Sequence, residues 1–212
     1  MSPSNMTLPK PTELDEAAAW SAYLRTKVAD ISHTITLRNG STVDVRPIRP
    51  DDVGRLQQFH ARLSPDTIVM RYFRAAPILY NRDARRLTHL DYDNRMALVA
   101  TTGAGDDERI IGVVRYERVT ATEGELAFVV EDQWQGLSIS TRLLARLLAY
   151  ARSRGFEHMS AITMASNVRM RGVLAHAGYP YTSEYEEGCV TLTLDITQES
   201  TRIEEPTASA HS

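Results

Sequence analysis

The feature that most constrains the fold is an apolar segment followed by a short polar turn and a long amphipathic helix, within residues 125–155. The first six residues have the composition of a buried strand, and leucines recur at helical spacing after the turn. A strand, a turn and a helix in this order present free N–H groups and a partial positive charge, which favour a bound phosphate. Such turns are usually rich in glycine, but this one has only Gly136, together with Ser138 and Ser140. The sequence therefore predicts a phosphate-binding turn of unusual composition.

Strand and helix patterns alternate on both sides of this unit. Residues 33–48 are typical of two strands joined by Asn39-Gly40, a strong hairpin signal. We expect the other elements as helices near 50–63, 64–73 and 81–90, strands at 96–102, 109–119 and 125–130, a helix to about 154, a strand at 156–165, a helix from 167 to 177, and two final strands ending at 196. This order predicts an α/β domain with a mixed sheet over residues 32–197.

The two ends of the chain differ from this central domain. Residues 1–31 are predicted to form an extension with one amphipathic helix, whose apolar stripe consists of Trp20, Leu24, Val28 and Ile31. This stripe is expected to pack either on its own domain or on a partner or dimer surface. Residues 198–212 are polar and without periodicity, so we predict a disordered tail.

The composition limits the classes of partner. With 42% hydrophobic residues, 24% charged residues and a formal net charge of −3, the chain is not typical of a general nucleic-acid binder. No apolar run reaches the ~20 residues that a membrane helix needs, and no signal-peptide pattern begins the sequence. The single cysteine, Cys189, excludes an internal disulfide, and the histidines lack metal-ligand spacing. We expect a cytoplasmic protein, monomeric or homodimeric, that uses no metal, membrane or nucleic acid.

The turn and the order of elements resemble the GCN5-related N-acetyltransferase (GNAT) family. The family signature is Gln or Arg, two variable residues, Gly, one variable residue, and Gly or Ala. Here Gln135 occupies the first position, while Ser138 and Ser140 occupy the two small ones. The stretches VRPIRPDDVGRLQQFHARLSPD (45–66) and LDYDNRMALVA (90–100) further resemble the acetyltransferase domain of bacterial protein-lysine acetyltransferases. The resemblance implies a mostly antiparallel central sheet flanked by helices, acetyl-CoA as co-substrate, and an amine acceptor such as a protein lysine.

The resemblance also implies where acetyl-CoA binds. In this family the fourth core strand and the next helix separate around the cofactor, the strand's end pairs with the pantetheine arm, and the turn holds the pyrophosphate. A plain strand–helix turn with Ser138 as the N-cap is the alternative, and Asn167 could serve only as a helix cap. The predicted cofactor-binding residues are Phe128, Val129, Val130, Gln135, Gly136, Leu137, Ser138, Ile139, Ser140, Thr141 and Asn167.

The two serines have opposite possible effects on this site. A positive φ at either position would cost roughly 1–2 kcal/mol because of the Cβ atom. Helical geometry at both positions would cost almost nothing and would leave the hydroxyls free to donate to a phosphate. Serine is comfortable at the start of a helix. We therefore expect both serines to be helical.

Acetyl transfer to an amine requires a group that removes a proton from the ammonium. Glu125 is the candidate general base, because the resembled lysine acetyltransferases have a glutamate on this strand; a solvent-facing strand-end residue is the alternative. Glu131 and Asp132 are expected to be exposed turn charges. Many family members have a tyrosine as general acid where this chain has Leu174. The sequence thus predicts direct N-acetyl transfer, with a small-molecule amine acetyltransferase or a non-catalytic acyl-CoA-binding module as alternatives.

Overall fold

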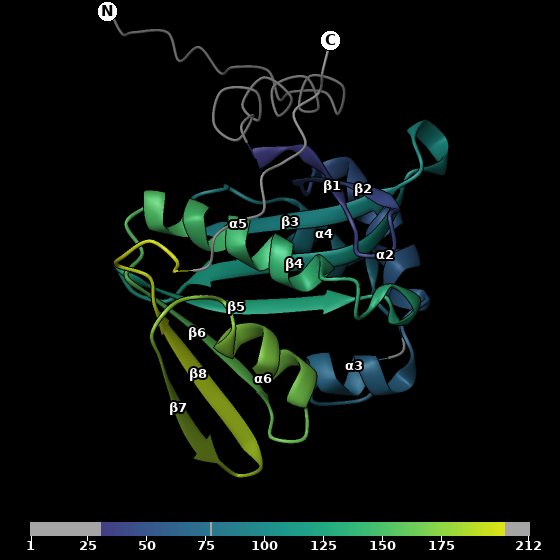
Figure 1. Cartoon of the computed structure of the whole chain (residues 1–212). Helices are drawn as coiled ribbons and strands as arrows, with labels where there is room; N and C mark the ends of the chain where they lie inside the picture. The colour runs from purple at the N-terminus through teal and green to yellow at the C-terminus, as the bar shows by residue number, and fades with distance from the viewer. Residues whose placement is uncertain (1–30, 77, 202–212) are drawn as a thin grey trace, which may run out of the picture. The chain divides into compact units, whose positions relative to one another are not determined.

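Eight strands form one sheet in the part of the chain that the computed structural model describes, residues 31–76 and 78–201 (Figure 1). Their order is β1-β2-β3-β4-β5-β6-β8-β7, and only β5 and β6 pair in parallel. The strands are β1 (His33–Thr36), β2 (Thr42–Pro47), β3 (Arg95–Thr102), β4 (Arg109–Arg118), β5 (Glu123–Val130), β6 (His158–Met164), β7 (Tyr181–Glu186) and β8 (Cys189–Asp195). The predicted mixed, mostly antiparallel sheet is confirmed.

Helices cover both faces of this sheet in the predicted order. Figure 1 shows α5 crossing β3 and β4 on the near face, with α2 and α4 behind them. The α-helices are α2 (Val53–Ala61), α3 (Pro65–Tyr72), α4 (Asn81–Thr88), α5 (Ile139–Ser153) and α6 (Val168–Ala175), and short 3-10 turns are η2 (Pro50–Asp52), η3 (Gly105–Asp107) and η4 (Asp132–Trp134). Because β3 is covered on both faces, residues 96–100 are completely buried.

Local sequence signals explain how two of these elements begin or end. The hairpin between β1 and β2 turns at Gly40, which has a φ of +82°, and the Asn39 side chain accepts a hydrogen bond from the Ser41 N–H at 3.1 Å. Helix α5 ends before Gly155, which has a φ of +80° and donates its N–H to the Arg152 carbonyl at 3.0 Å. Glycine suits both positions because a Cβ atom disfavours positive φ.

Close packing fixes α5 against the centre of the sheet. A Cβ atom added to Gly112 of β4 would lie 3.2 Å from side-chain atoms of both Ile139 and Val130. The backbone of β4 therefore approaches the first residue of α5 and the last residue of β5 more closely than a larger residue would allow. This contact places the N-terminus of α5 beside the end of β5, where the predicted phosphate-binding turn lies.

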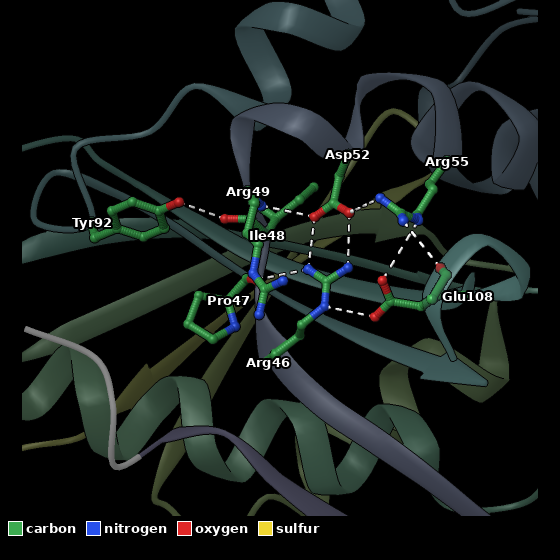
Figure 2. A network of polar contacts seen from close by, with 9 residues as sticks. Arg46, Pro47, Ile48, Arg49, Asp52, Arg55, Tyr92 and Glu108 are labelled. Atoms are coloured by element: carbon green, nitrogen blue, oxygen red, sulfur yellow. Dashed lines mark hydrogen bonds and ion pairs between the residues drawn. The ribbon is translucent and has the colours of Figure 1, made fainter. Parts of the chain in front are cut away.

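A buried ion network joins β2 to the helices behind the sheet (Figure 2). The Arg46 guanidinium donates two hydrogen bonds to the Asp52 carboxylate, at 2.7 and 2.8 Å, and a third to Glu108 at 2.9 Å. The same Asp52 carboxylate accepts the Arg49 N–H at 2.8 Å. Burial alone would lower the pKa of Arg46, but the hydrogen bonds to the two carboxylates outweigh it and raise that pKa. We call Arg46, Asp52 and Glu108 the paired arginine network.

The structure leaves both predicted ends of the chain largely undescribed. The apolar stripe of the N-terminal extension lies outside the described residues except for Ile31. The tail predicted from residue 198 lies mostly outside them too, but its first four residues are described. Of these, Thr201 donates its N–H to the Gly178 carbonyl at 2.9 Å, and Glu199 pairs with Arg152 at 2.9 Å. None of the described helices has both the length and the apolar character needed to span a membrane.

Candidate active site

The sheet opens between β5 and β6. These strands pair only where residues 123–125 of β5 meet residues 158–160 of β6. The rest of β5 has β4 as its only strand partner among the described residues. Five residues of β5 therefore have one backbone edge without a strand beside it, which leaves room for an extended group to pair there.

The hydrogen-bond pattern shows which residues of β5 face this opening. Glu131 donates its N–H to Ile111 across the β4–β5 pair at 2.9 Å. Bonding alternates along an antiparallel ladder, so the even-numbered residues of β5 direct their backbone groups away from β4. Phe128 and Val130 are such residues. The Val130 carbonyl accepts a hydrogen bond from the Gln135 amide at 3.1 Å, which leaves the backbone of Phe128 facing the opening.

The turn between β5 and α5 concentrates N–H donors beside this opening. Within the described chain, no protein acceptor receives the backbone N–H of any residue from 136 to 141. Gly136 has a φ of +79° and open space around its Cβ position. Six free donors at the N-terminus of a 15-residue helix form an anion-binding arrangement, because the helix dipole adds a partial positive charge.

The prediction that both serines are helical is wrong for one of them. Ser138 has a φ of 69° and a ψ of 12°, in the left-handed region, whereas Ser140 lies within α5. Ser138 does occupy the N-cap position, but its side chain makes no capping hydrogen bond. The turn needs a left-handed residue there, and a Cβ atom makes that conformation unfavourable by roughly 1–2 kcal/mol. The strain belongs to the position that is glycine in the family signature.

Hydrogen bonds from two helices hold the turn in place. The Gln135 side chain bonds to the Val130 carbonyl and accepts from Arg169 of α6 at 2.7 Å. Asp132 accepts from the Ser64 hydroxyl at 2.6 Å and from the Thr67 hydroxyl at 2.7 Å, so it ties the start of α3 to the turn. Burial alone would raise the pKa of Asp132, but these hydrogen bonds lower it. Gln135 and Asp132 thus connect the entry to the turn with α6 and α3.

A cleft of about 1380 Å³ lies beside the unpaired end of β5, between the turn, α3 and α6. This volume exceeds the roughly 300–1,000 Å³ of typical small-molecule sites. Of the predicted cofactor-binding residues, Leu137 does not line the cleft. Asn167 lines the cleft and also caps α6, because its side chain accepts the Met170 N–H at 3.1 Å. Leu174, at the position where many family members have a tyrosine, is fully buried. The cleft brings together ten of the eleven predicted cofactor-binding residues: Phe128, Val129, Val130, Gln135, Gly136, Ser138, Ile139, Ser140, Thr141 and Asn167.

Glu125 lines a second cleft, of about 780 Å³, on the face of the sheet opposite α5. In the β4–β5 pair Glu125 lies opposite Glu117, and Ala127 lies opposite Arg115. Residues that are directly opposite share a face, so these four side chains project toward the same cleft. Glu125 is exposed, and Arg71 of α3 lines both this cleft and the larger one. Arg71 therefore lies where the two clefts adjoin.

Glu131 does not behave as the exposed turn charge that the sequence predicts. It is 4% exposed, and its carboxylate lies 3.0 Å from the Arg62 guanidinium and 3.7 Å from that of Arg109. The Gln133 amide donates to it at 2.6 Å. These partners, two of which are distant in sequence, offset the cost of burying the charge.

Comparisons with known proteins agree with this geometry. The model of the acetyltransferase (GNAT) family matches residues 66–179, more than half of the chain. The acetyltransferase PA5475 of Pseudomonas aeruginosa is 33% identical over 150 residues, which cover 68% of this chain and 78% of that protein. The acetyltransferase Pat of Mycolicibacterium smegmatis is 28% identical over 76% of this chain and 48% of its own length. The crystal structure of the GNAT domain of S. lividans PAT superposes with a TM-score of 0.73 and 35% identity, covering 79% of this chain and 98% of that one.

The fold and the site thus define an acyltransferase of the N-acetyltransferase class. The chain belongs to the GNAT acetyltransferase family, as the family model and the similar proteins show. It spans about half the length of the Mycolicibacterium Pat protein that it matches.

Proposed function

We propose that the chain transfers an acetyl group from acetyl-CoA directly to an amine, and that the acceptor is a protein lysine. The observation that carries the proposal is the junction at β5. One cleft there is lined by five of the six residues with free N–H donors, Gly136 and residues 138–141, and the adjoining cleft is lined by Glu125. The resemblance of residues 45–66 and 90–100 to bacterial protein-lysine acetyltransferases supports the lysine acceptor.

The proposed binding of acetyl-CoA follows from the donors and acceptors in the larger cleft. The N–H groups of residues 136–141 would hold the pyrophosphate, and the backbone of Phe128 would pair with the pantetheine arm like an added strand. When bound, the thioester supplies an activated acetyl group to an attacking amine. Because β5 lines both clefts, its residues would bring the thioester and the amine to the same point.

Glu125 is proposed as the group that accepts the amine's proton, directly or through one water molecule. The amine nitrogen then bonds to the acetyl carbon, the carbon–sulfur bond breaks, and CoA leaves as a thiolate. The sequence of α6 contains no tyrosine, and the buried Leu174 offers no proton. Water would therefore protonate the thiolate.

Three measurements test this function. Calorimetry with acetyl-CoA is expected to show stoichiometric binding, and thiol release with a panel of amines is expected to show turnover. Acetylation of a cell lysate, read by mass spectrometry, then identifies the acceptors as lysines or small molecules. Binding of acetyl-CoA without turnover on any protein or small amine would refute the enzymatic assignment and would indicate an acyl-CoA-binding module.

A further inference from the structure

The second cleft is strongly positive, although the chain as a whole is negative. Six arginines and three carboxylates line the cleft, in a chain whose formal net charge is −3. A free lysine ammonium would be repelled by such a wall unless an anion accompanied it. The distribution of charge in this cleft is therefore informative about the acceptor.

Arg115 is an arginine of this cleft that forms no ion pair within the described chain. It is half-buried on β4, and its neighbours on the adjoining strands are Ala97 and Ala127. Its guanidinium donates to the Leu87 carbonyl at 3.1 Å, and no carboxylate of the described chain lies within ion-pair distance of it. Arginine is seldom buried without a paired anion, because removing a charge from water is costly.

Arg71 increases this imbalance instead of relieving it. It projects from α3, contacts the Tyr72 ring at 5.0 Å, and also has no carboxylate of the described chain within ion-pair distance. Burial, followed by the charge of Arg71, lowers the pKa of Arg115. Two guanidinium groups thus lie close enough to repel each other beside the proposed base.

His60 provides an independent observation at the same place. Together with Arg71 and Arg115 it lines a cavity of about 20 Å³, which has room for about one water molecule or one oxygen of a ligand. His60 is 2% exposed, and its Nδ1 has no hydrogen-bond partner in the described structure. An unsatisfied buried nitrogen beside two unpaired guanidinium groups indicates a missing polar group.

We infer that Arg71 and Arg115 bind a carboxylate of the acceptor, so that the preferred amine carries an acidic group close to the reacting nitrogen. This inference rests on the proposed function. Glu125 is one diagonal step from Arg115 on the sheet, a separation of about 7–8 Å between Cα atoms. An amine at Glu125 and a carboxylate at Arg115 would therefore belong to one ligand. In a protein the carboxylate would come from an acidic residue flanking the lysine, and in a small molecule from the acceptor itself.

Paired substrates test the inference. Two lysine peptides that differ only in Glu or Gln beside the lysine are compared with free lysine and lysinamide, which differ in the α-carboxylate. We expect kcat/KM to favour the acidic member of at least one pair by about 10-fold or more, the size of one charge-assisted hydrogen bond. The pair that shows the preference identifies whether the carboxylate comes from a flanking residue or from the amine itself.

Substitutions of Arg71 on α3 and Arg115 on β4 test whether these side chains cause the preference for acidic substrates. Arg71→Met and Arg115→Met are each expected to reduce the acidic-to-neutral ratio to near one, and Arg115→Lys to retain part of it. Arg82→Met is the matched control, because Arg82 is 92% exposed on the neighbouring α4 and lines neither cleft. It removes the same charge and should leave the ratio unchanged. Thermal melting of each variant verifies that it is folded.

The results separate this inference from the proposed function. Turnover with no acidic preference, or a preference that persists in both methionine variants, would overturn the inference and leave the N-acetyltransferase assignment intact. If no amine is acetylated, binding is measured instead, by calorimetry of peptides with Nε-acetyl-lysine beside Glu or Gln in the presence of CoA. A preference for the Glu peptide that is lost in both variants would support the carboxylate site, and equal affinities would overturn it.

Discussion

Arg46 and Arg115 lie on strands of the same sheet, yet their surroundings are opposite. Arg46 on β2 is almost completely buried, with two carboxylates hydrogen-bonded to its guanidinium, and its pKa is raised (Figure 2). Arg115 on β4 is half-buried, with alanines on both neighbouring strands, and its pKa is lowered. The first arrangement is complete within the described protein, whereas in the second no carboxylate of the described chain lies within ion-pair distance of the guanidinium.

The difference indicates which arginine serves the fold and which serves a ligand. A buried arginine with matched carboxylates fixes the chain segments that supply its partners. In the paired arginine network these segments are the end of β2, the last residue of η2 and the residue after η3. An arginine without such partners has no carboxylate that neutralises its charge, so this charge remains available to a bound molecule.

The largest effect is expected when the paired arginine network is broken. Arg46→Met leaves the Asp52 carboxylate, which is 0% exposed, without its bidentate partner. The free energy of unfolding should fall by about 3–5 kcal/mol, because the buried carboxylate loses its two hydrogen bonds to Arg46 and keeps only the more distant Arg55 guanidinium, at 3.5 Å, as a cationic partner. Urea unfolding measures the change.

A second substitution verifies the cause. Asp52→Asn in the Arg46→Met background removes the stranded charge, so the double variant should be more stable than the sum of the two single losses predicts, by about 2 kcal/mol. Simple additivity, or a loss below about 1 kcal/mol in Arg46→Met, would show that the network contributes little to the fold.

Loss of the Glu125 carboxylate from the second cleft should lower activity and leave stability nearly unchanged, in contrast to Arg46→Met. Glu125→Gln retains size and hydrogen bonding but cannot accept a proton, so turnover should fall by about 10²-fold, with acetyl-CoA affinity nearly unchanged. Because Glu125 is exposed and lies opposite Glu117, stability should stay within about 0.5 kcal/mol. Steady-state kinetics from about pH 6 to pH 9 and thermal melting measure the two effects. Turnover equal to the wild type across that range would remove Glu125 from the mechanism.

The paired arginine network should also contribute to the dependence of stability on pH. Burial alone would raise the pKa of Glu108, but Arg46 and Arg55 lower it below the ordinary value of 4.5. A depressed carboxylate pKa contributes stability that is complete above the ordinary value and is lost as pH falls through the folded-state value. Glu108→Gln should therefore be about 2 kcal/mol less stable at neutral pH, as expected for a hydrogen bond to a charged group. Urea unfolding between about pH 7 and pH 3 should show the two proteins converging toward low pH, and parallel curves would contradict the prediction.

The fold could be predicted from sequence because its signals are local. The Asn39-Gly40 turn, the helix end at Gly155 and the alternation of strands and helices depend on neighbouring residues alone. Glu131 was mispredicted because its partners Arg62 and Arg109 are remote in sequence. Burial of a charge is decided by such long-range contacts, which one sequence does not reveal.

The candidate site also contains residues that could be predicted from local sequence and residues that only long-range contacts bring together. Residues 128–141 form a contiguous strand, turn and helix, so their arrangement could be expected, but the positive φ of Ser138 depends on how the whole turn packs. Arg71 and His60 were missed because they reach the second cleft from separate helices. Arg115 did leave a signal, as the one charged residue in the apolar run of residues 110–116. A charge inside a strand pattern indicates either a buried pair or a ligand contact.

The smallest expected effect is that of Arg115→Met on stability, and it distinguishes a structural role of Arg115 from a role in binding a ligand. Arg115→Met removes one hydrogen bond to the Leu87 carbonyl, worth about 1 kcal/mol, but it also removes a desolvated charge that Arg71 repels. These changes have opposite signs, so the free energy of unfolding should stay within about 0.5 kcal/mol of the wild type. Urea unfolding of Arg115→Met beside Arg46→Met makes the comparison direct. A loss near 3 kcal/mol in Arg115→Met would mean that Arg115 has a structural role like that of Arg46, and the contrast between the two arginines would fail.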